Sequence, residues 1–272
     1  MNLLGGRAWR LELFPLIAAE VPDFSLDRAL RYGLLPAVWS SENPDEDLDS
    51  YTSTYLKEEI MTEGLSRNLP AFSRFLKVAA LSSGGLVNYA EMASNAQLAE
   101  STVRGHFEVL QDTLLGFLLE PFTESRKRKA IQTPKFYFFD NGVRHLLLGT
   151  SSLDRNSDLY GNSFETWFAH ELRAYVSYSR LKTPLTYWRS TSNFEVDFLI
   201  GTKAAIEVKA TKRATDRHLK GLAALAEENI CDRYYLVTQD PLIRQVPLHR
   251  GKKAVFVPWQ KFIELLWAGE VV

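Results

Sequence analysis

Residues 195–209 read EVDFLIGTKAAIEVK, and this stretch sets the expected fold of the C-terminal half of the chain. Two runs that carry β-branched and aromatic residues, 194–200 and 204–209, stand on either side of a short connection at 201–203. Runs of this composition predict β-strands, and a short connection that contains glycine predicts that the strands form a hairpin.

Three charged side chains of this hairpin are candidates for a catalytic site. Residues two apart in a strand share a face, so Glu207 and Lys209 are expected to point the same way. With the connection at 201–203, Asp197 falls opposite Glu207, and two carboxylates meet one ammonium. Carboxylates this close repel each other unless a cation lies between them. Metal-dependent phosphodiester hydrolysis requires such a set, because oxygen ligands hold Mg²⁺ and a lysine orients water or stabilises developing charge.

The residues next to these charges help to decide whether the hairpin is half-exposed or buried. The simpler one is a half-exposed hairpin with an ordinary cross-strand salt bridge, which contributes little to stability. Against it, apolar neighbours in both strands predict a buried, central hairpin, where charges need partners. These neighbours are Val196, Phe198, Ile206 and Val208. We therefore favour a functional site.

The segments around the hairpin predict a helix, three antiparallel strands, a second helix and a further strand, in that order. An amphipathic segment at 161–179 comes first and carries Glu165. A strand near 185–189 precedes the hairpin, and a helix over 215–229 and a strand at 233–238 follow it.

This order, together with Glu165, Asp197 and the Glu207-Val208-Lys209 element, resembles the PD-(D/E)XK nuclease superfamily. The resemblance implies an α/β, restriction-endonuclease-like αβββαβ core over 151–272. It also implies that Asp197, Glu207 and Glu165 hold Mg²⁺ or Mn²⁺ and that Lys209 positions the attacking water. Because one acid comes from the first helix, the arrangement is most similar to archaeal-type Holliday junction resolvases.

Alternatives remain open at this site. Glu171 lies on the same helical segment as Glu165 and competes for its role, while Glu195 is an accessory candidate two residues from Asp197. The whole set could also belong to a catalytically inactive relative that binds DNA or a partner protein.

Four stretches, two of them in the hairpin, carry a narrower resemblance over nearly the whole chain. They are similar to the C-terminal part of a prokaryotic AAA+-type ATPase family, in which the domain of unknown function 4143 follows a nucleotide-binding core and a winged helix. The chain has no G-x-x-x-x-G-K-[ST] phosphate loop, so we expect the ATPase core to be absent and no ATP hydrolysis. The four stretches are 6–20, 138–142, 195–197 and 206–209.

Residues 1–50 are predicted to be a remnant or linker that follows the absent core. Within them, 3–20 are expected to form an edge strand and a connection. The acidic run 42–49, which includes Pro44, is expected to be a solvated linker.

Residues 51–150 are predicted to form a winged helix-turn-helix. Asn88 is placed to cap a short helix, and a longer helix follows after a turn, which is the helix-turn-helix pattern. We expect Arg104 and His106 on the outward face of the longer helix. The helices are predicted at 51–65, 70–82, 89–95 and 100–112.

The wing of this unit is predicted from strands at 115–122 and 135–139, with four consecutive cations at 126–129 near the tip. A wing tip lies beside the DNA backbone, where each cation neutralises phosphate. Basic tips can also be merely solvated, and winged helices also dock proteins. The candidates for DNA contact are Arg126, Lys127, Arg128, Lys129, Arg104, Lys212 and Arg213.

Composition sets limits on the remaining classes. Of the 272 residues, 46% are apolar and 24% charged, and the net charge of −1 leaves any case for DNA binding to local patches. The single cysteine, Cys231, excludes an internal disulfide, which fits the cytoplasm. No apolar run reaches the roughly 20 residues that span a bilayer, so we expect no membrane partner. The expected partners are DNA, an ATPase domain or another protein, or a second copy of the chain.

Overall fold

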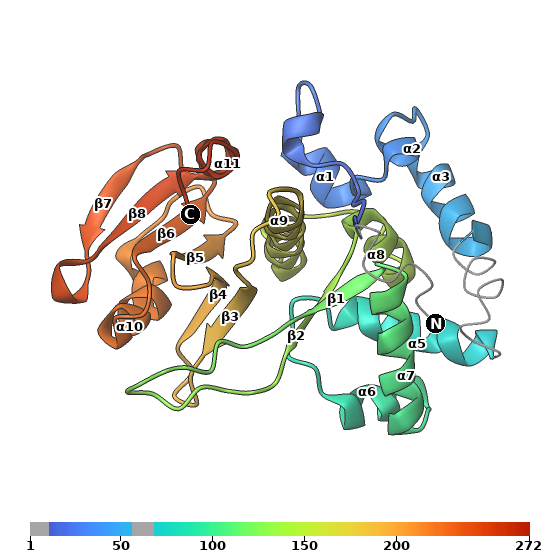
Figure 1. Ribbon diagram of the computed structural model, residues 1–272. Helices are drawn as coiled ribbons and strands as arrows, with labels where there is room; N and C mark the ends of the chain where they lie inside the picture. Colours follow the sequence, from blue (N-terminus) through green and yellow to red (C-terminus); the bar gives the residue numbers. More distant parts are fainter. Residues whose placement is uncertain (1–10, 56–67) are drawn as a thin grey trace.

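A six-stranded sheet, in the order β3-β4-β5-β6-β8-β7, organises the C-terminal half of the computed structural model, which describes residues 11–55 and 68–272 (Figure 1). Strands β3, β4 and β5 are antiparallel, β5, β6 and β8 are parallel, and β7 pairs antiparallel with β8 at the edge. The strands are β3 (Leu185–Arg189), β4 (Glu195–Ile200), β5 (Ala204–Lys209), β6 (Arg233–Thr238), β7 (Arg244–Pro247) and β8 (Lys253–Pro258).

Helices cover both faces of this sheet. On one face, helices α9 (Asp158–Tyr178) and α11 (Trp259–Trp267) share an aromatic and aliphatic core with the strands, including Phe168, Phe198 and Phe262. On the other face, α10 (Lys220–Glu228) packs on the sheet through residues such as Leu222. Short 3-10 turns, η3 (Asp216–Leu219) and η4 (His249–Gly251), precede α10 and β8.

The predicted order of elements is confirmed as α9, β3, β4, β5, α10 and β6. The final pair of strands, β7 and β8, was not predicted. Residues of β7 alternate between half-buried and exposed, and its last residue is a proline, as is common on edge strands. The chain is therefore mixed α/β.

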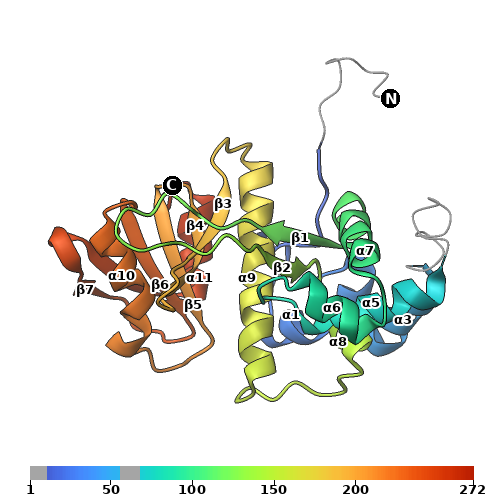
Figure 2. The same cartoon turned by 90° about the horizontal axis from the view of Figure 1, so that it is seen from below.

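Helix α9 lies between this sheet and the N-terminal helices (Figure 2). Its Trp167 and Leu172 share one buried core with Leu30 and Leu34 of the N-terminal part and with strands of the large sheet. The N-terminal part therefore packs on the same helix that carries Glu165.

Residues 68–138 form three helices and a two-stranded antiparallel sheet. The predicted helices are confirmed as α5 (Leu69–Leu81), α6 (Tyr89–Ala96) and α7 (Glu100–Asp112), and Asn88 caps α6 through the N–H of Glu91. Of the helix predicted at 51–65, residues Tyr51–Tyr55 are helical (η2), and 56–65 lie outside the described residues. The two strands are β1 (Gly116–Leu119) and β2 (Lys135–Phe138), and α8 (Asn141–Leu148) follows them.

Residues 11–50 contain three α-helices: α1 (Leu26–Tyr32), α2 (Pro36–Trp39) and α3 (Pro44–Ser50). The prediction of a solvated linker at 42–49 was therefore wrong. Pro44 starts α3, and acids occupy its first turn, both of which favour a helix N-terminus, while Leu48 is buried.

The predicted edge strand at 3–20 was also wrong for its described part. Residues 11–20 form no strand and end in a 3-10 turn, η1 (Ala18–Glu20). Their backbone bonds side chains of α9 instead: the Phe14 N–H donates to the Tyr178 hydroxyl, and the Ala18 N–H to Glu171.

The expected outward position of His106 was wrong. His106 is buried against the rings of Phe72 and Phe75, on the same stripe of α7 as Val103 and Leu110. The spacing of three and four residues from these apolar positions already places it on the inner face.

Candidate active site

A β-bulge changes the side-chain direction of β4 at Asp197. The register between β3 and β4 shifts between Thr186 and Trp188, so one residue of β3 stands opposite two residues of β4. As a result Val196 packs on the α10 side and Phe198 on the α9 side, although residues two apart on a regular strand share a face.

Strands β4 and β5 form the predicted hairpin, with its connection at 201–203. Their pairing ends at Phe198↔Ile206, and continuing this register places Asp197 opposite Glu207, as predicted. The Asp197 carboxylate then accepts the backbone N–H of Val208 at 2.8 Å. A side-chain oxygen thus replaces a ladder carbonyl and fixes Asp197 between the two strands.

Asp197, Glu207 and Lys209 come together as the sequence predicts. The Lys209 ammonium lies 2.7 Å from Oε1 of Glu207 and 3.2 Å from Oδ2 of Asp197. Both carboxyl groups are buried, whereas 37% of the lysine side chain is exposed. One ammonium therefore holds two buried carboxylates and also reaches solvent.

The two carboxyl groups have pKa values displaced in opposite directions. Burial and the charge of Asp197 raise the pKa of Glu207 to about 8, against the opposing effect of Lys209. Burial also acts to raise the pKa of Asp197, but Lys209, Lys135 and the Val208 N–H outweigh it and hold that pKa below its ordinary value. Asp197 is therefore the stronger acid of the pair and Glu207 the weaker one.

Glu165 of α9 lies beside this pair but is held by residues of β2. Its Oε1 accepts from the Tyr137 hydroxyl at 2.6 Å and from the Lys135 ammonium at 3.2 Å. Burial and the charge of Asp197 raise the pKa of Glu165, while Lys135 acts to lower it. The side chain of Lys135 is only 4% exposed, so its charge depends on these carboxylates.

Lys135 and Tyr137 were not identified from the sequence. They stand two apart in an otherwise apolar strand, and this spacing places both on one face of β2. A lysine and a tyrosine on one face of a buried strand were the available signal, but their partner lies 30 residues away from Lys135.

The two alternative acids have separate positions. Glu195 belongs to the same group of charged residues: its Oε1 lies 2.5 Å from the Lys135 ammonium, and its Oε2 lies 3.2 Å from Arg189. We call this group the acidic cluster; it consists of Lys135, Tyr137, Glu165, Glu195, Asp197, Glu207 and Lys209. Glu171 is buried and accepts the N–H of Ala18, so it anchors the N-terminal segment. Glu171 therefore does not take the place of Glu165.

The residues at this site partly fit a hard divalent cation. Among the described residues, no three His, Cys, Asp or Glu side chains are arranged to hold a metal ion. However, Oε2 of Glu207 is buried and has no hydrogen-bond partner within the described part of the chain. A buried carboxylate oxygen of this kind is a suitable ligand for Mg²⁺ or Mn²⁺, with Asp197 beside it as a second. Glu165, in contrast, is occupied by Lys135 and Tyr137.

A polar pocket of about 460 Å³ opens next to the acidic cluster. Glu165 and Lys209 line it from α9 and β5, and His218 of η3 also contributes. The exposed Lys212 and Arg213 follow Thr211, another lining residue. The pocket thus gives a ligand access to two of the four predicted catalytic residues.

The basic connection between β1 and β2 runs across to the large sheet rather than ending in a free tip (Figures 1 and 2). Phe122 and Tyr187 bond through their backbones, and the N–H of Thr191 donates to the carbonyl of Lys129. The N–H groups of residues 126–128 all donate to the carboxylate of Glu228 at the end of α10, at 2.7–3.1 Å.

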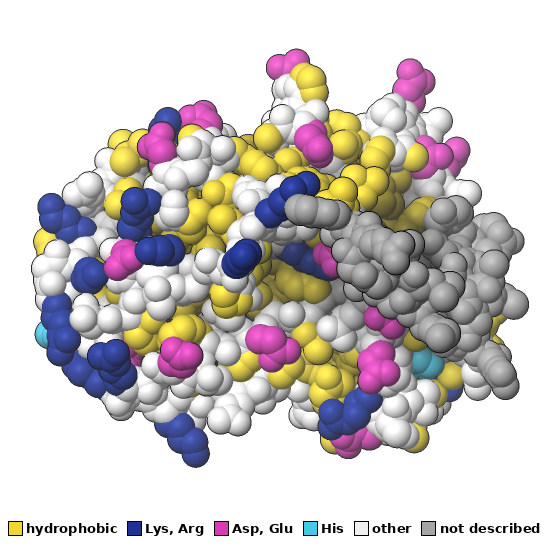
Figure 3. Space-filling model, viewed as in Figure 1, with side chains coloured by type: hydrophobic (Ala, Val, Ile, Leu, Met, Phe, Trp, Pro, Cys, Tyr) yellow, Lys and Arg dark blue, Asp and Glu magenta, His cyan; other side chains and the backbone are white. Residues whose placement is uncertain are grey.

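Because the connection packs on α10, Arg128 has a structural role instead of the predicted contact with DNA. Arg128 pairs with Glu227 at 2.6 Å and donates to the carbonyl of Ala224, so it anchors the connection and is not free for DNA. Arg126, Lys127 and Lys129 remain exposed. Lys and Arg side chains also gather along the left edge of the face in Figure 3, in the region of β7 and α10.

Arg104 is exposed on α7, as predicted, but it is paired with Glu100 at 2.6 Å and lies over the ring of Tyr89. A DNA phosphate would have to compete with Glu100 for this guanidinium.

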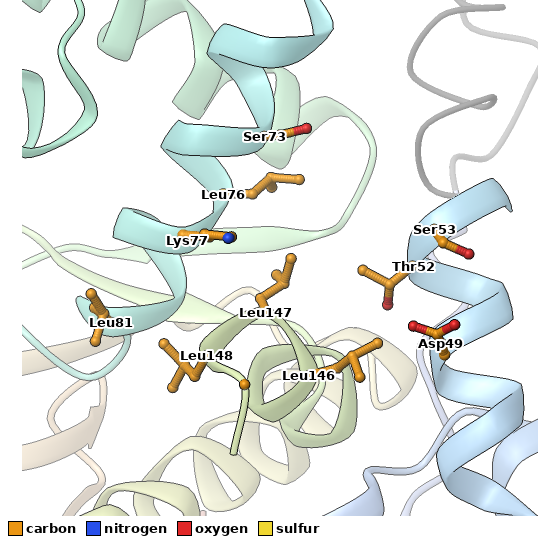
Figure 4. Close-up of a pocket in the computed structure, with 11 residues that line it drawn as sticks. Asp49, Thr52, Ser53, Ser73, Leu76, Lys77, Leu81, Leu146, Leu147 and Leu148 are labelled. Carbon is orange, nitrogen blue, oxygen red and sulfur yellow. The ribbon is translucent and has the colours of Figure 1, made fainter. Parts of the chain in front are cut away.

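A second pocket, of about 610 Å³, lies between α5, α8 and the end of α3 (Figure 4). Leu76 and Leu147 point into the space between these elements, and Lys77 and Asp49 also line the pocket. None of the residues of the acidic cluster line it, so the two pockets are separate.

Comparisons with known proteins divide the chain into two matched regions. A family model described as domain of unknown function DUF8612 matches residues 23–154, and one described as domain of unknown function DUF4143 matches residues 160–259. The second match confirms that part of the resemblance. Lys135 and Tyr137 lie in the first region, and the other residues of the acidic cluster lie in the second.

Two uncharacterized mycobacterial proteins are similar to the chain. One is from Mycobacterium tuberculosis and one from Mycobacterium bovis, each 30% identical over 217 residues, which cover 76% of this chain and 48% of the relative. The chain therefore spans about half the length of the curated relatives it matches. No solved structure matches. Within the described residues, no helix combines the length and apolar character needed to cross a membrane.

Proposed function

We propose that the chain is a DNA-binding module with a metal-dependent phosphodiesterase site of the PD-(D/E)XK type. The observation that carries the proposal is the convergence of buried Asp197 and Glu207, from adjacent strands, on the ammonium of Lys209, with one Glu207 oxygen unpartnered among the described residues. The order of elements from α9 to β6 supports a restriction-endonuclease-like core.

The roles of the residues follow from their chemistry. Asp197 and Glu207 would hold Mg²⁺ or Mn²⁺, which, when bound, supplies Lewis-acid stabilisation and lowers the pKa of water. Lys209 reaches from these carboxylates to the pocket, so it is suited to position a water molecule and to stabilise charge on a phosphate. Glu165 assists from α9.

DNA binding is proposed for the cations around this site. Helices α5 to α7 with β1 and β2 would be a winged helix, with Arg104 on the helix exposed to DNA. Arg126, Lys127 and Lys129 on the connection, with Lys212 and Arg213 beside the pocket, would contact phosphates and release counterions.

We propose, from the resemblance alone, that this module belongs to a larger ATPase of the AAA+ type; the relatives are about twice as long as the matched region. ATP hydrolysis is not proposed for this chain, because it lacks the phosphate loop.

One observation favours a second candidate, a catalytically inactive module that docks DNA or a partner protein. Lys135 and Lys209 neutralise much of the acidic cluster, and no three metal-ligating side chains are assembled in the described residues. A site that relies on ammonium groups for its counter-charge does not need a metal for folding.

A cleavage assay separates the candidates. Purified protein is incubated with labelled linear duplex, single-stranded and four-way-junction DNA, with and without Mn²⁺, beside the Asp197→Ala variant. Metal-dependent cleavage that the variant lacks is the expected result. Binding without cleavage by either protein would favour the docking module, and equal cleavage by both would refute the assignment of Asp197.

A further inference from the structure

Lys135 is a buried cation of β2 that forms ion pairs with acidic residues of α9 and β4. Its ammonium lies 2.5 Å from Glu195 and 3.2 Å from Glu165, and the ring of Tyr187 lies 5.5 Å away. Its backbone is fixed by pairing of β2 with β1 and by a bridge to Leu86. Because the backbone of Lys135 is fixed in this way, a movement of β2 would separate its ammonium from Glu165 and Glu195.

Glu165 lies between the polar pocket on one side and the side chains of Lys135 and Tyr137 on the other. It lines the polar pocket next to Lys209, and the same carboxylate is held by Lys135 and Tyr137 through one oxygen, Oε1. While this contact persists, a cation at this site would be left with Asp197 and Glu207, which share the Lys209 ammonium, and with the unpartnered Oε2 of Glu207 among the described residues.

We propose that Lys135 is an internal counter-cation that restrains the acidic site, because it holds Glu165 away from a divalent cation bound by Asp197 and Glu207. The inference rests on the proposed function. It means that the part of the chain matched by one family model controls the cation affinity of a site in the part matched by the other. A movement of β2 relative to α9 would release Glu165 and complete a three-carboxylate site.

The inference is tested by calorimetric titration of Mn²⁺ into the full chain and its variants. Lys135→Gln removes the charge but keeps a hydrogen-bonding group of similar length, and Lys135→Met removes both. Lys182→Gln, at an exposed lysine, is the matched control. Circular dichroism and thermal unfolding establish that each variant is folded.

The expected result is that Lys135→Gln binds Mn²⁺ about tenfold more tightly than the wild type, because Glu165 loses its ammonium partner and becomes available as a third carboxylate ligand. Glu165→Gln should leave the affinity of the wild type within about twofold, yet remove the gain in the Lys135→Gln background. This non-additivity is the signature of Glu165 as a ligand only after Lys135 is neutralised.

Two outcomes would overturn the inference, and they differ in what they leave standing. If the wild type binds Mn²⁺ in an Asp197-dependent manner and Lys135→Gln binds no more tightly, Lys135 does not restrain the site, and the proposed metal-dependent function remains. If the wild type and Lys135→Gln both fail to bind Mn²⁺, the inference and the metal-dependent part of the proposed function fall together.

Discussion

Lys135 and Glu165 lie in regions matched by two different family models, yet the ammonium of one is 3.2 Å from the carboxylate of the other. The contact is half-buried and includes Tyr137, which donates to the same oxygen. The acidic cluster is therefore built jointly by the helical part of the chain and the large sheet. A fragment that contains only the second region would leave Glu165 without both partners.

The docking of the basic connection on α10 should depend on Glu228. Replacement by Gln weakens three backbone N–H bonds to a fully buried carboxylate, so we expect a loss of about 1–3 kcal/mol in the free energy of unfolding. Trypsin should also cut faster within residues 126–129. The control is Glu227→Gln, because this partly exposed neighbour pairs with the Arg128 side chain and not with the backbone N–H groups of residues 126–128, so a small effect is expected. If trypsin cut the connection of Glu228→Gln no faster than that of the wild type, this account would be contradicted.

The exposed cations of the connection should contribute to DNA affinity through phosphate contacts. Simultaneous replacement of Arg126, Lys127 and Lys129 by Ala should weaken duplex binding for all sequences alike. It should also reduce the slope of log K against log salt by up to about 2.7, at roughly 0.9 per phosphate. Fluorescence anisotropy at several salt concentrations measures both. Replacement of exposed Lys261 on α11 by Ala, the control, should have no effect. An unchanged salt slope in the triple variant would show that DNA phosphates do not contact the connection.

Stability should vary with pH through Glu171. Burial raises the pKa of Glu171 to about 8, from an ordinary value of 4.5, although the Ala18 N–H opposes the rise. The folded protein thus holds this proton more tightly than the unfolded chain, so the stabilisation is complete below pH 4.5 and is lost as the pH rises through 8.

Glu171→Gln mimics the protonated side chain and should lack this loss. The wild type should therefore become less stable relative to the variant between pH 5 and 8, by at most about 1.4 kcal/mol per pH unit. Urea unfolding of both proteins at several pH values measures the difference, in which the other titrating groups cancel. A difference that does not change with pH would show that Glu171 is ionised in the folded protein.

The approach of α10 to β4 should tolerate no side chain at Gly221. A Cβ atom there would lie 1.7 Å from the carbonyl oxygen of Glu195, so Gly221→Ala must push the helix from the strand that carries Asp197. We expect a loss of about 1–3 kcal/mol or more in the free energy of unfolding. Gly105→Ala on α7 meets nothing within 4 Å and should instead stabilise by about 1 kcal/mol. Chemical denaturation of both variants tests the contrast, which equal effects would contradict.

The hairpin and the order of elements around it could be predicted from the sequence, because each depends on local information. Apolar periodicity identified α5, α7 and α9, and the spacing of Glu207 and Lys209 along one strand fixed their common side. The bulge at Asp197 could not be predicted, since it arises from the register with β3 and not from the sequence of β4 alone.

The rest of the site depends on contacts between distant segments. Lys135 meets Glu165 and Glu195 only because β2 packs against α9, and Arg128 meets Glu227 only because the connection crosses to α10. From the sequence alone, a run of four cations is equally consistent with a solvent-exposed loop and with a loop that contacts DNA phosphates. The acidic run at 42–49 misled for a related reason: its charges lie on the outer side of a helix whose Leu48 is buried.

The most direct test of the central claim is the rate of Mn²⁺-dependent DNA cleavage by the wild type and by Asp197→Asn under identical conditions. Asn keeps an oxygen that can accept the Val208 N–H, so the hairpin should remain intact while the negative charge is lost. Asp232→Asn, at an exposed acid, is the matched control. We predict that cleavage by Asp197→Asn falls to the metal-free background while Asp232→Asn cleaves as the wild type does. Cleavage by Asp197→Asn at the wild-type rate would contradict the assignment of this acidic cluster as a nuclease site.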